Sequence, residues 1–370
     1  MLTLENNQLV FKFPEVHKDA TCRIEFQRTL RIPDDNREYP LPPGRGSFPL
    51  SHVDDYKDRV PASWVEHGGV MLPMAQAEAM WIRFTSRYPF AVKIAAGKIN
   101  AVSGEAWRPE LQRKGHWAVQ GPAHDLLARA PHEQAAFEES LKHQARREYI
   151  PGEQDYVTLP SQPWLDGFNV GQGKIRQFVA MPLGDGYTVE EQLTGEALHG
   201  GLQIIVYPIK PEFYVPPTPS PLRGMLFFAS AAMPNSVASA ASAEMGLAAG
   251  GLMKQKIYED TYGYDKWDQT HSSRCFVHLL NSTAYRAVTG KEPPVGVPTA
   301  ADYTAAGLPW FDLYDEHKGA VVGSDKLAKV DSVAALGIKK GENPLPENTP
   351  LPVAPTVIGL PKNAVREGEF

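Results

Sequence analysis

Segments in which apolar and polar residues alternate recur along the chain, and this pattern constrains the fold most. Residues 2–13 and 22–32 both alternate in this way, which is typical of half-buried strands. Four further strand-like segments are DYVTLP (155–160), KIRQFVAMPL (174–183), LQIIVYPI (202–209) and SSRCFVHLLNS (272–282). Strands therefore outnumber helices, and we predict an α+β fold: a strand-rich, largely antiparallel sheet with short helices and Pro-rich extended segments.

Three helices and one hairpin are predicted within this frame. A helix should begin at Pro73, because proline suits the first helical position and the apolar residues after it repeat at helical spacing: Met74, Ala77, Met80, Trp81 and Phe84. Residues 131–148 predict a charged helix whose acidic half comes first, as the helix dipole favours. Residues 282–290 predict a short helix closed by Gly290, and residues 90–105 predict a hairpin that turns at Gly97-Lys98.

Proline-rich segments suggest how the chain is divided. Residues 208–222 contain six prolines, and residues 341–370 contain six more, so both should be extended. The 370 residues exceed the ~250–300 at which single domains usually stop growing. We therefore predict four parts: an N-terminal α+β region (1–207) with a helical insertion (131–148), a Pro-rich strap (208–222), a C-terminal α+β region (223–340) that could belong to the same domain, and an extended tail (341–370).

Charge and cysteine content restrict the classes of partner and compartment. The formal net charge is −6, which argues against nucleic acid as a partner because such binding needs a basic face. The two cysteines, Cys22 and Cys275, lie in apolar strand-like segments, and buried thiols in a reducing compartment are the simplest interpretation. The opening MLTLENNQLVFKF lacks the features of a signal peptide. These observations favour a cytoplasmic protein.

Residues 224–243 are the one segment that imitates a membrane span. They carry no charge, but they include Pro234, Asn235 and four serines. The apolar part is shorter than the ~20 residues that a spanning helix needs. We expect a flexible Ala/Ser loop and no integral membrane insertion.

The stretch GDGYTVEEQLTG, residues 184–195, opens with a turn that resembles a phosphate-binding loop. Thr188 and Glu191 have the spacing of a capping box, and Gly195 should end the short helix. A phosphate loop usually has a basic residue nearby, whereas this segment carries Asp185 and two glutamates. We therefore interpret Gly184 and Gly186 as corner residues at a helix N-terminus that its own carboxylates occupy.

Two acidic loops are candidate ligand or metal sites. In the loop 258–274, oxygen ligands that could hold calcium are accompanied by a histidine and an arginine: Asp260, Asp265, Asp268, His271 and Arg274. The alternative is that these carboxylates cap turns and pair with Arg274. In the loop 51–59, Asp54, Asp55 and Asp58 could be metal ligands or an acid/base pair. Their spacing matches no established metal motif, so we predict no cofactor.

Four strings resemble an uncharacterised family of bacterial and fungal proteins: MPLGDGYTVEEQLTG, HGGLQIIVYPIK, MGLAAGG and AGLPWFDLYD. The resemblance covers roughly residues 21–330. Some members of that family are labelled as membrane proteins, which disagrees with the absence of a credible spanning segment here. The resemblance implies no activity, ligand or catalytic residue, and the charged segment 131–148 is not among the shared strings.

A non-enzymatic, cytoplasmic, protein-binding or self-assembling structural protein is the function that these patterns favour. No catalytic constellation is recognisable, and the Pro-rich tail carries spaced apolar residues that suit a groove or sheet edge on a second copy: Leu351, Val353, Val357, Ile358 and Leu360. The alternative for the tail is that it packs back on its own domain. The alternative is a metal-dependent enzyme or small-ligand binder that uses the acidic loops near Asp54 and Asp265.

Overall fold

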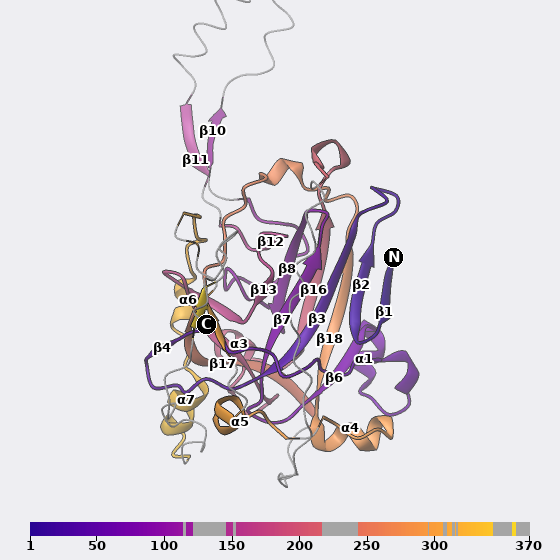
Figure 1. Ribbon diagram of the computed structural model, residues 1–370, viewed down its shortest axis with the longest axis vertical. Coiled ribbons are helices and arrows are strands. Elements are labelled where there is room, and N and C mark those ends of the chain that lie inside the picture. Colours follow the sequence, from indigo (N-terminus) through magenta and orange to yellow (C-terminus); the bar gives the residue numbers. More distant parts are fainter. Residues whose placement is uncertain are drawn as a thin grey trace, which may run out of the picture.

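The architecture described below is that of a computed structural model (Figure 1). The structure describes residues 1–113, 116–120, 146–150, 153–216, 243–294, 296–305, 309–312, 315, 317–342 and 357–359.

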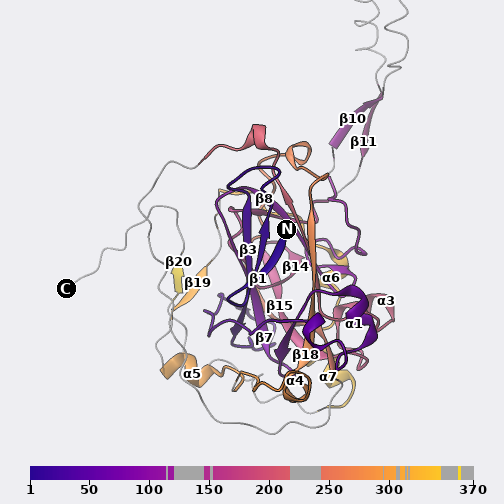
Figure 2. The ribbon, with the colours of Figure 1, turned by 90° about the vertical axis from the view of Figure 1, so that its right-hand side faces the viewer.

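One sheet of sixteen strands forms the body of the protein. Every pairing along its main path is antiparallel, and the few short helices lie around it (Figures 1 and 2). The prediction of a strand-rich α+β fold with a large antiparallel sheet is confirmed. In spatial order the path contains β1 (Leu2–Glu5), β2 (Gln8–Lys12), β3 (Thr21–Thr29), β7 (Ala79–Ser86), β15 (Lys174–Pro182), β17 (Glu244–Lys254), β18 (Ser273–Asn281), β16 (Leu202–Pro208), β8 (Phe90–Ala96) and β12 (Val157–Leu159).

Six shorter strands of the same sheet pair with strands of this path or with one another. Most are antiparallel to their neighbours, whereas β4 is parallel to β17 and β6 is parallel to β18. These strands are β4 (Glu38–Tyr39), β5 (Ser51–His52), β6 (Val70–Met74), β9 (Ile99–Asn100), β13 (Trp164–Leu165) and β14 (Gly167–Gly171).

The sheet folds over at the junction between β17 and β18. These two long strands pair only through Glu244 and Met245 of β17, so they diverge beyond that point and separate the sheet into two halves. The halves share one core, because Phe13, which follows β2, packs on Phe90 of β8 with ring centroids 5.8 Å apart. Both side chains are buried, and each such burial contributes roughly 1.5–3 kcal/mol.

Strands from both sides of the Pro-rich segment 208–222 contribute to this sheet. β17 and β18, which follow that segment in the sequence, lie between β15 and β16, which precede it. The regions that flank the segment are therefore joined by continuous strand pairing. Of the segment itself, residues 208–216 are described, and they include the short turn η2 (Pro211–Phe213).

The helices of the described residues are all short. α4 shows why the sequence predicts it: the Asn281 side chain accepts a hydrogen bond from the Thr283 amide at its start, and Gly290 closes its end with φ of 71°. The predicted helix over 282–290 is confirmed. The helices are α1 (Ala62–His67), α3 (Val189–Thr194), α4 (Ser282–Thr289), α5 (Ala300–Ala305), α6 (Asp325–Ala328) and α7 (Val333–Lys339), with the 3-10 turns η1 (Asp54–Tyr56) and η3 (Tyr264–Lys266).

The predicted helix that starts at Pro73 is wrong. Pro73 lies inside β6, and the following apolar residues belong mainly to β7. Between the two strands, Ala77 has φ of 62°, a left-handed conformation that a right-handed helix does not contain. Along β7 the side chains of Met80, Ile82 and Phe84 are buried, while those between them are less buried. The apolar residues therefore follow a strand period of two.

The predicted hairpin over 90–105 is confirmed at its turn. β8 and β9 pair antiparallel, and Gly97 between them has φ of 55°. A side chain at this position would be strained whatever the space around it, because L residues rarely adopt that conformation.

β10 (His116–Gln120) and β11 (Arg146–Ile150) form a separate two-stranded sheet that projects from the body (Figures 1 and 2). The charged helix predicted over 131–148 falls mostly outside the described residues. Its predicted C-terminal end is wrong, because residues 146–148 belong to β11.

In the part of the chain that the structure describes, no helix combines the length and the apolar character that crossing a membrane requires. The uncharged segment 224–243 lies outside that part except for Ala243.

Candidate functional site

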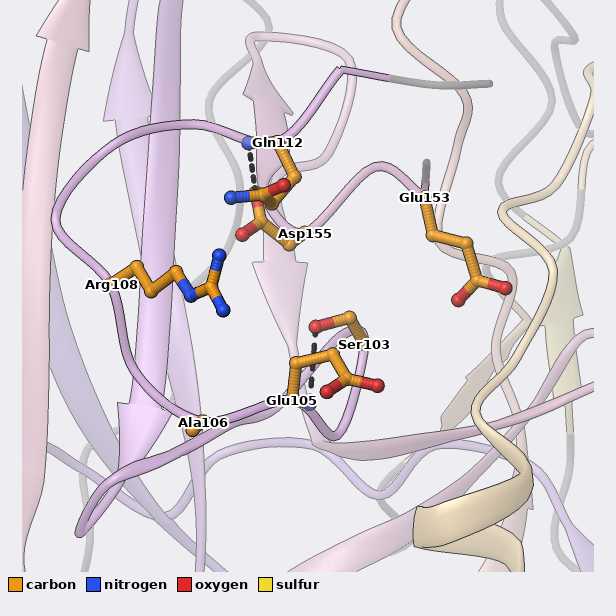
Figure 3. Close-up of a pocket in the computed structure, with 7 residues that line it drawn as sticks. All are labelled: Ser103, Glu105, Ala106, Arg108, Gln112, Glu153 and Asp155. Carbon is orange, nitrogen blue, oxygen red and sulfur yellow. Dashed lines mark hydrogen bonds between the residues drawn. The ribbon is translucent and has the colours of Figure 1, made fainter. Parts of the chain in front are cut away.

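A hollow of about 360 Å³ lies beside the segments that lead into β10 and follow β11, and Figure 3 shows its lining. Its lining comes from the loop that follows β9 and from the residues that precede β12. Six of its seven side chains carry hydrogen-bonding or charged groups: Ser103, Glu105, Ala106, Arg108, Gln112, Glu153 and Asp155. These side chains offer a ligand several hydrogen-bonding and charged partners.

One lining residue, Asp155, belongs to a buried ion pair. Lys93 stands in the middle of β8, and its Nζ lies 2.5 Å from Asp155 Oδ2, with side-chain exposures of 1% and 4%. The same ammonium donates to the Glu110 carbonyl at 2.5 Å and lies 5.6 Å from the centre of the Trp107 ring. A buried lysine is costly unless it is paired and hydrogen-bonded, so these contacts explain how an apolar strand accommodates it.

The Asp155 carboxylate is held from two sides. Its second oxygen, Oδ1, accepts a hydrogen bond from the Gln112 backbone amide at 2.9 Å. Burial raises the pKa of the Asp155 carboxyl, and the neighbouring Lys93 ammonium opposes that increase. Asp155 is therefore a fixed structural group that positions the loop above it.

The loop that carries the lining is fixed by Asn100. Its Oδ1 accepts from the amides of Val102 and Ser103 at 2.8 and 2.9 Å, and its Nδ2 donates to the Asp155 carbonyl at 2.7 Å. At Gly104, whose φ is 70°, a Cβ atom would lie 2.3 Å from Ser324 Oγ of the segment that caps α6. The lining is thus supported by buried polar contacts, a requirement for a defined binding geometry.

The rim of the hollow carries two charged groups that make no hydrogen bond or ion pair within the described part of the chain. The Arg108 guanidinium points into the hollow from one side, and the Glu153 carboxylate stands on the opposite side (Figure 3). Both residues are exposed. By contrast, Glu105 is paired with Lys326 Nζ at 2.7 Å. The arrangement presents one positive and one negative group to a solute that enters the hollow.

The structure places the candidate residues of the loop 258–274 in turns. Asp260 accepts hydrogen bonds from Tyr156 Oη and Trp267 Nε1, both at 2.8 Å, and from the amides of Tyr262 and Gly263. Its carboxylate therefore has the contacts of a structural group. The capping role proposed as the alternative to a calcium site accounts for Asp260.

The remaining candidates in that loop have separate partners. Asp265 pairs with Arg113, next to the segment that lines the hollow, but does not itself line it. Asp268 accepts from the Thr270 amide at 3.0 Å, and its Oδ2 lies 2.7 Å from Nδ1 of His271. Arg274 is exposed on β18, and no ion pair joins it to these carboxylates among the described residues. The expected pairing with Arg274 is wrong.

Asp54, Asp55 and Asp58 lie on the exposed surface of η1 and the turn after it. η1 belongs to the β5–α1 connection beside β6, and among the described residues no hydrogen bond or ion pair joins these three carboxylates to the 258–274 loop. Within the described ranges, no three histidine, cysteine or acidic side chains form a group that could hold a metal ion.

The Gly-Asp-Gly turn before α3 donates its backbone amides to a carboxylate of the same chain, that of Glu191. The amides of Gly184, Gly186 and Thr188 donate to Glu191 at 2.9, 2.8 and 3.1 Å, and Thr188 Oγ1 donates at 2.7 Å. The predicted capping box is confirmed, and Gly195 ends the helix with φ of 77°. The donors that a phosphate would need are thus occupied by Glu191.

Two of the tail residues proposed for self-association are described. Val357 and Ile358 belong to β20 (Val357–Gly359), which pairs in parallel with β19 (Trp310–Asp312) of the same chain. The other three, Leu351, Val353 and Leu360, lie outside the described residues. Their role in self-association stays a prediction.

The predicted burial of both cysteines is confirmed, and neither Cys22 nor Cys275 forms a disulfide. Sequence reasoning missed the hollow, whose groups come from separate segments. One signal was present: Lys93 is the only charged residue in the apolar strand FAVKIAA, and such a residue requires a buried partner. The sequence does not reveal that this partner is Asp155.

No family model, curated protein or solved structure matches this chain. The resemblance to bacterial and fungal proteins therefore stays a prediction, and function is inferred from the residues of the chain itself.

Proposed function

We propose that this chain is a non-enzymatic binding protein that holds a small polar ligand in the hollow beside Asp155. The observation that carries this proposal is the pair of oppositely charged groups, Arg108 and Glu153, that face one hollow without partners among the described residues. Asp155, which lines the same hollow, is held in place by its buried pair with Lys93. Ligand sites commonly combine a fixed base with a few convergent polar groups.

Binding is favoured over turnover because the most protected groups of the site are engaged with each other. Lys93 donates to Asp155 and to a backbone carbonyl, and Asp155 also accepts from the Gln112 amide. A general acid or base must exchange a proton with a substrate, and these contacts already occupy the Lys93 ammonium and both oxygens of the Asp155 carboxylate. Ser103 Oγ lies on the lining, where it accepts from the Glu105 amide at 3.4 Å.

A screen of small polar molecules by thermal unfolding tests the proposal. A ligand at ten times its Kd adds about 1.4 kcal/mol to the free energy of unfolding, so we expect a rise in melting temperature of roughly 1–4 °C. Ala106→Trp should abolish the rise by filling the hollow. The matched control is Ala62→Trp on the exposed start of α1. The proposal fails if no compound shifts the melting temperature, or if the shift persists in Ala106→Trp.

Self-association through the tail is a second candidate function, suggested by the spaced apolar residues of the tail. β20 pairs with β19 of the same chain, as the alternative of a tail packed on its own domain expects. Strand addition of this kind can be satisfied within a chain or by exchange between two copies. Deletion should begin at residue 343, because the amides of Gly341 and Glu342 complete the C-terminal turn of α7. We expect the deletion to reduce the particle mass in light scattering while cooperative melting is kept. An unchanged mass, or a monomeric full-length chain, would reject this candidate.

The proposed compartment is the cytoplasm. Two buried free thiols are compatible with a reducing environment, in which disulfides rarely persist.

A further inference from the structure

The charges around the hollow define what kind of ligand would complement it. Two of its three carboxylates already have lysine partners, since Asp155 is paired with Lys93 and Glu105 with Lys326. What remains of the charge on the lining is one positive and one negative group on opposite sides. A complementary ligand would therefore carry one group of each sign and no net charge.

We propose that the hollow binds a zwitterion, a small molecule with a carboxylate at one end and an ammonium group at the other. The carboxylate faces Arg108, whose planar guanidinium can donate two parallel hydrogen bonds to it. The ammonium faces Glu153 across the hollow. This inference rests on the proposed function, which makes the hollow a ligand site.

Other ligand classes complement the lining less well. An anion would satisfy Arg108 and leave the Glu153 carboxylate facing a like charge. A cation would satisfy Glu153 and leave the guanidinium unpaired, and a neutral polar molecule would pair with neither charge. Each of these classes forms at most one charge-assisted contact, whereas a zwitterion forms two, so the lining favours the zwitterion.

The part of the ligand between its two ends would meet uncharged polar groups. Ser103 offers a hydroxyl from below, and the Gln112 side-chain amide stands above, next to Asp155 (Figure 3). Hydroxyl and amide groups can donate or accept, so they accommodate a peptide bond or a hydroxyl in the linking chain. The class therefore includes amino acids with separated charges and short peptides.

Three linear compounds of the same chain length separate the alternatives: aminopentanoate with its ammonium group on the terminal carbon, pentanoate and pentylamine. Their affinities are measured by titration calorimetry with the full chain. We expect the zwitterion to bind at least about tenfold more tightly than either singly charged compound, because it alone forms both charge-assisted contacts. Glycine and a dipeptide then show which separation of the charges fits best.

Variants of the two charged residues assign each end of the ligand. Arg108→Gln should reduce the affinity for aminopentanoate to that for pentylamine, and Glu153→Gln should reduce it to that for pentanoate. Both side chains are exposed and make no hydrogen bond or ion pair within the described residues, so the fold should tolerate these changes. Arg274→Gln and Asp54→Asn, which alter exposed charges elsewhere, should leave all three affinities unchanged.

The outcomes distinguish the two proposals. If a singly charged or neutral compound binds as tightly as the zwitterion and Ala106→Trp blocks it, the hollow is a ligand site but the zwitterion inference is wrong. If zwitterions bind equally well to Ala106→Trp, the site lies elsewhere and both proposals are rejected. Absence of binding by every compound in the screen also rejects both.

Discussion

Asp166, between β13 and β14, should contribute more to the stability of the protein in weak acid than at neutral pH. The carboxyl is buried, and its one side-chain partner among the described residues is Gln255, whose Nε2 donates to Oδ2 at 2.9 Å. Burial raises the pKa of Asp166 to about 7, and the hydrogen bond from Gln255 opposes the rise only in part. Between pH 3.8 and about 7, Asp166 is therefore a neutral carboxylic acid in the folded protein and a carboxylate in the unfolded chain.

The size and sign of the effect follow from these two pKa values. Below pH 3.8, the ordinary pKa, the carboxyl is protonated in both states, and Asp166 adds no penalty to folding. Between that value and about 7 the unfolded chain releases the proton and the folded chain keeps it, so stability falls as the pH rises. About three pKa units at about 1.36 kcal/mol each give a loss of about 4 kcal/mol at neutral pH and above.

Asp166→Asn removes the titration and keeps the shape of the side chain and its acceptor for Gln255. We expect its free energy of unfolding to match the wild type near pH 4 within about 1 kcal/mol and to exceed it by about 4 kcal/mol near pH 8. Urea unfolding monitored by tryptophan fluorescence measures both values. Asp54→Asn on the exposed η1 is the control and should show no such slope. A difference between Asp166→Asn and wild type that is constant with pH would refute the reasoning.

Three further changes test other buried contacts. Glu191→Ala removes the acceptor of four hydrogen bonds and should lower the free energy of unfolding, measured in urea, by about 2 kcal/mol. Thr188→Ala should lower it by only ~1 kcal/mol, and equal losses would contradict the role given to Glu191. Lys93→Met leaves Asp155 buried without its ion-pair partner and should lower the free energy of unfolding by roughly 3–5 kcal/mol. Adding Asp155→Asn to the same chain should restore part of this loss. If it restores none, the loss comes from packing. Burial lowers the pKa of His278 to about 4, so its contribution is lost as the pH falls below 6.5, and His278→Gln should flatten the acid side of the stability profile by up to about 3 kcal/mol.

The sequence predicts much of the sheet because strand residues carry a local signal. β3, β15, β16 and β18 each occupy a segment that alternates or runs apolar, and α4 is marked by its cap and by Gly290. The order of the strands in space carries no such signal, since β17 and β18 lie between strands that precede them in the chain.

The error after Pro73 shows how two periods can be confused. Apolar residues at positions 77, 80, 81 and 84 fit a helix, but in β7 the side chain of Trp81 is only partly buried and Ala77 turns the chain. The candidate site was beyond prediction for a different reason. Lys93, Arg108 and Glu153 are ordinary residues in their own segments, and only the tertiary fold brings them together.

The burial of both cysteines has a practical consequence for studying this protein. Thiol reagents react with the thiolate, and burial raises the pKa of Cys275 to about 12 and raises that of Cys22 as well. Since the chain has two cysteines in all, its folded form offers no reactive thiol to a maleimide dye or a spin label. A cysteine introduced at an exposed position such as Val357 would be modified selectively. Fluorescence transfer between such labels on mixed donor and acceptor populations would then report directly whether tails from different copies meet.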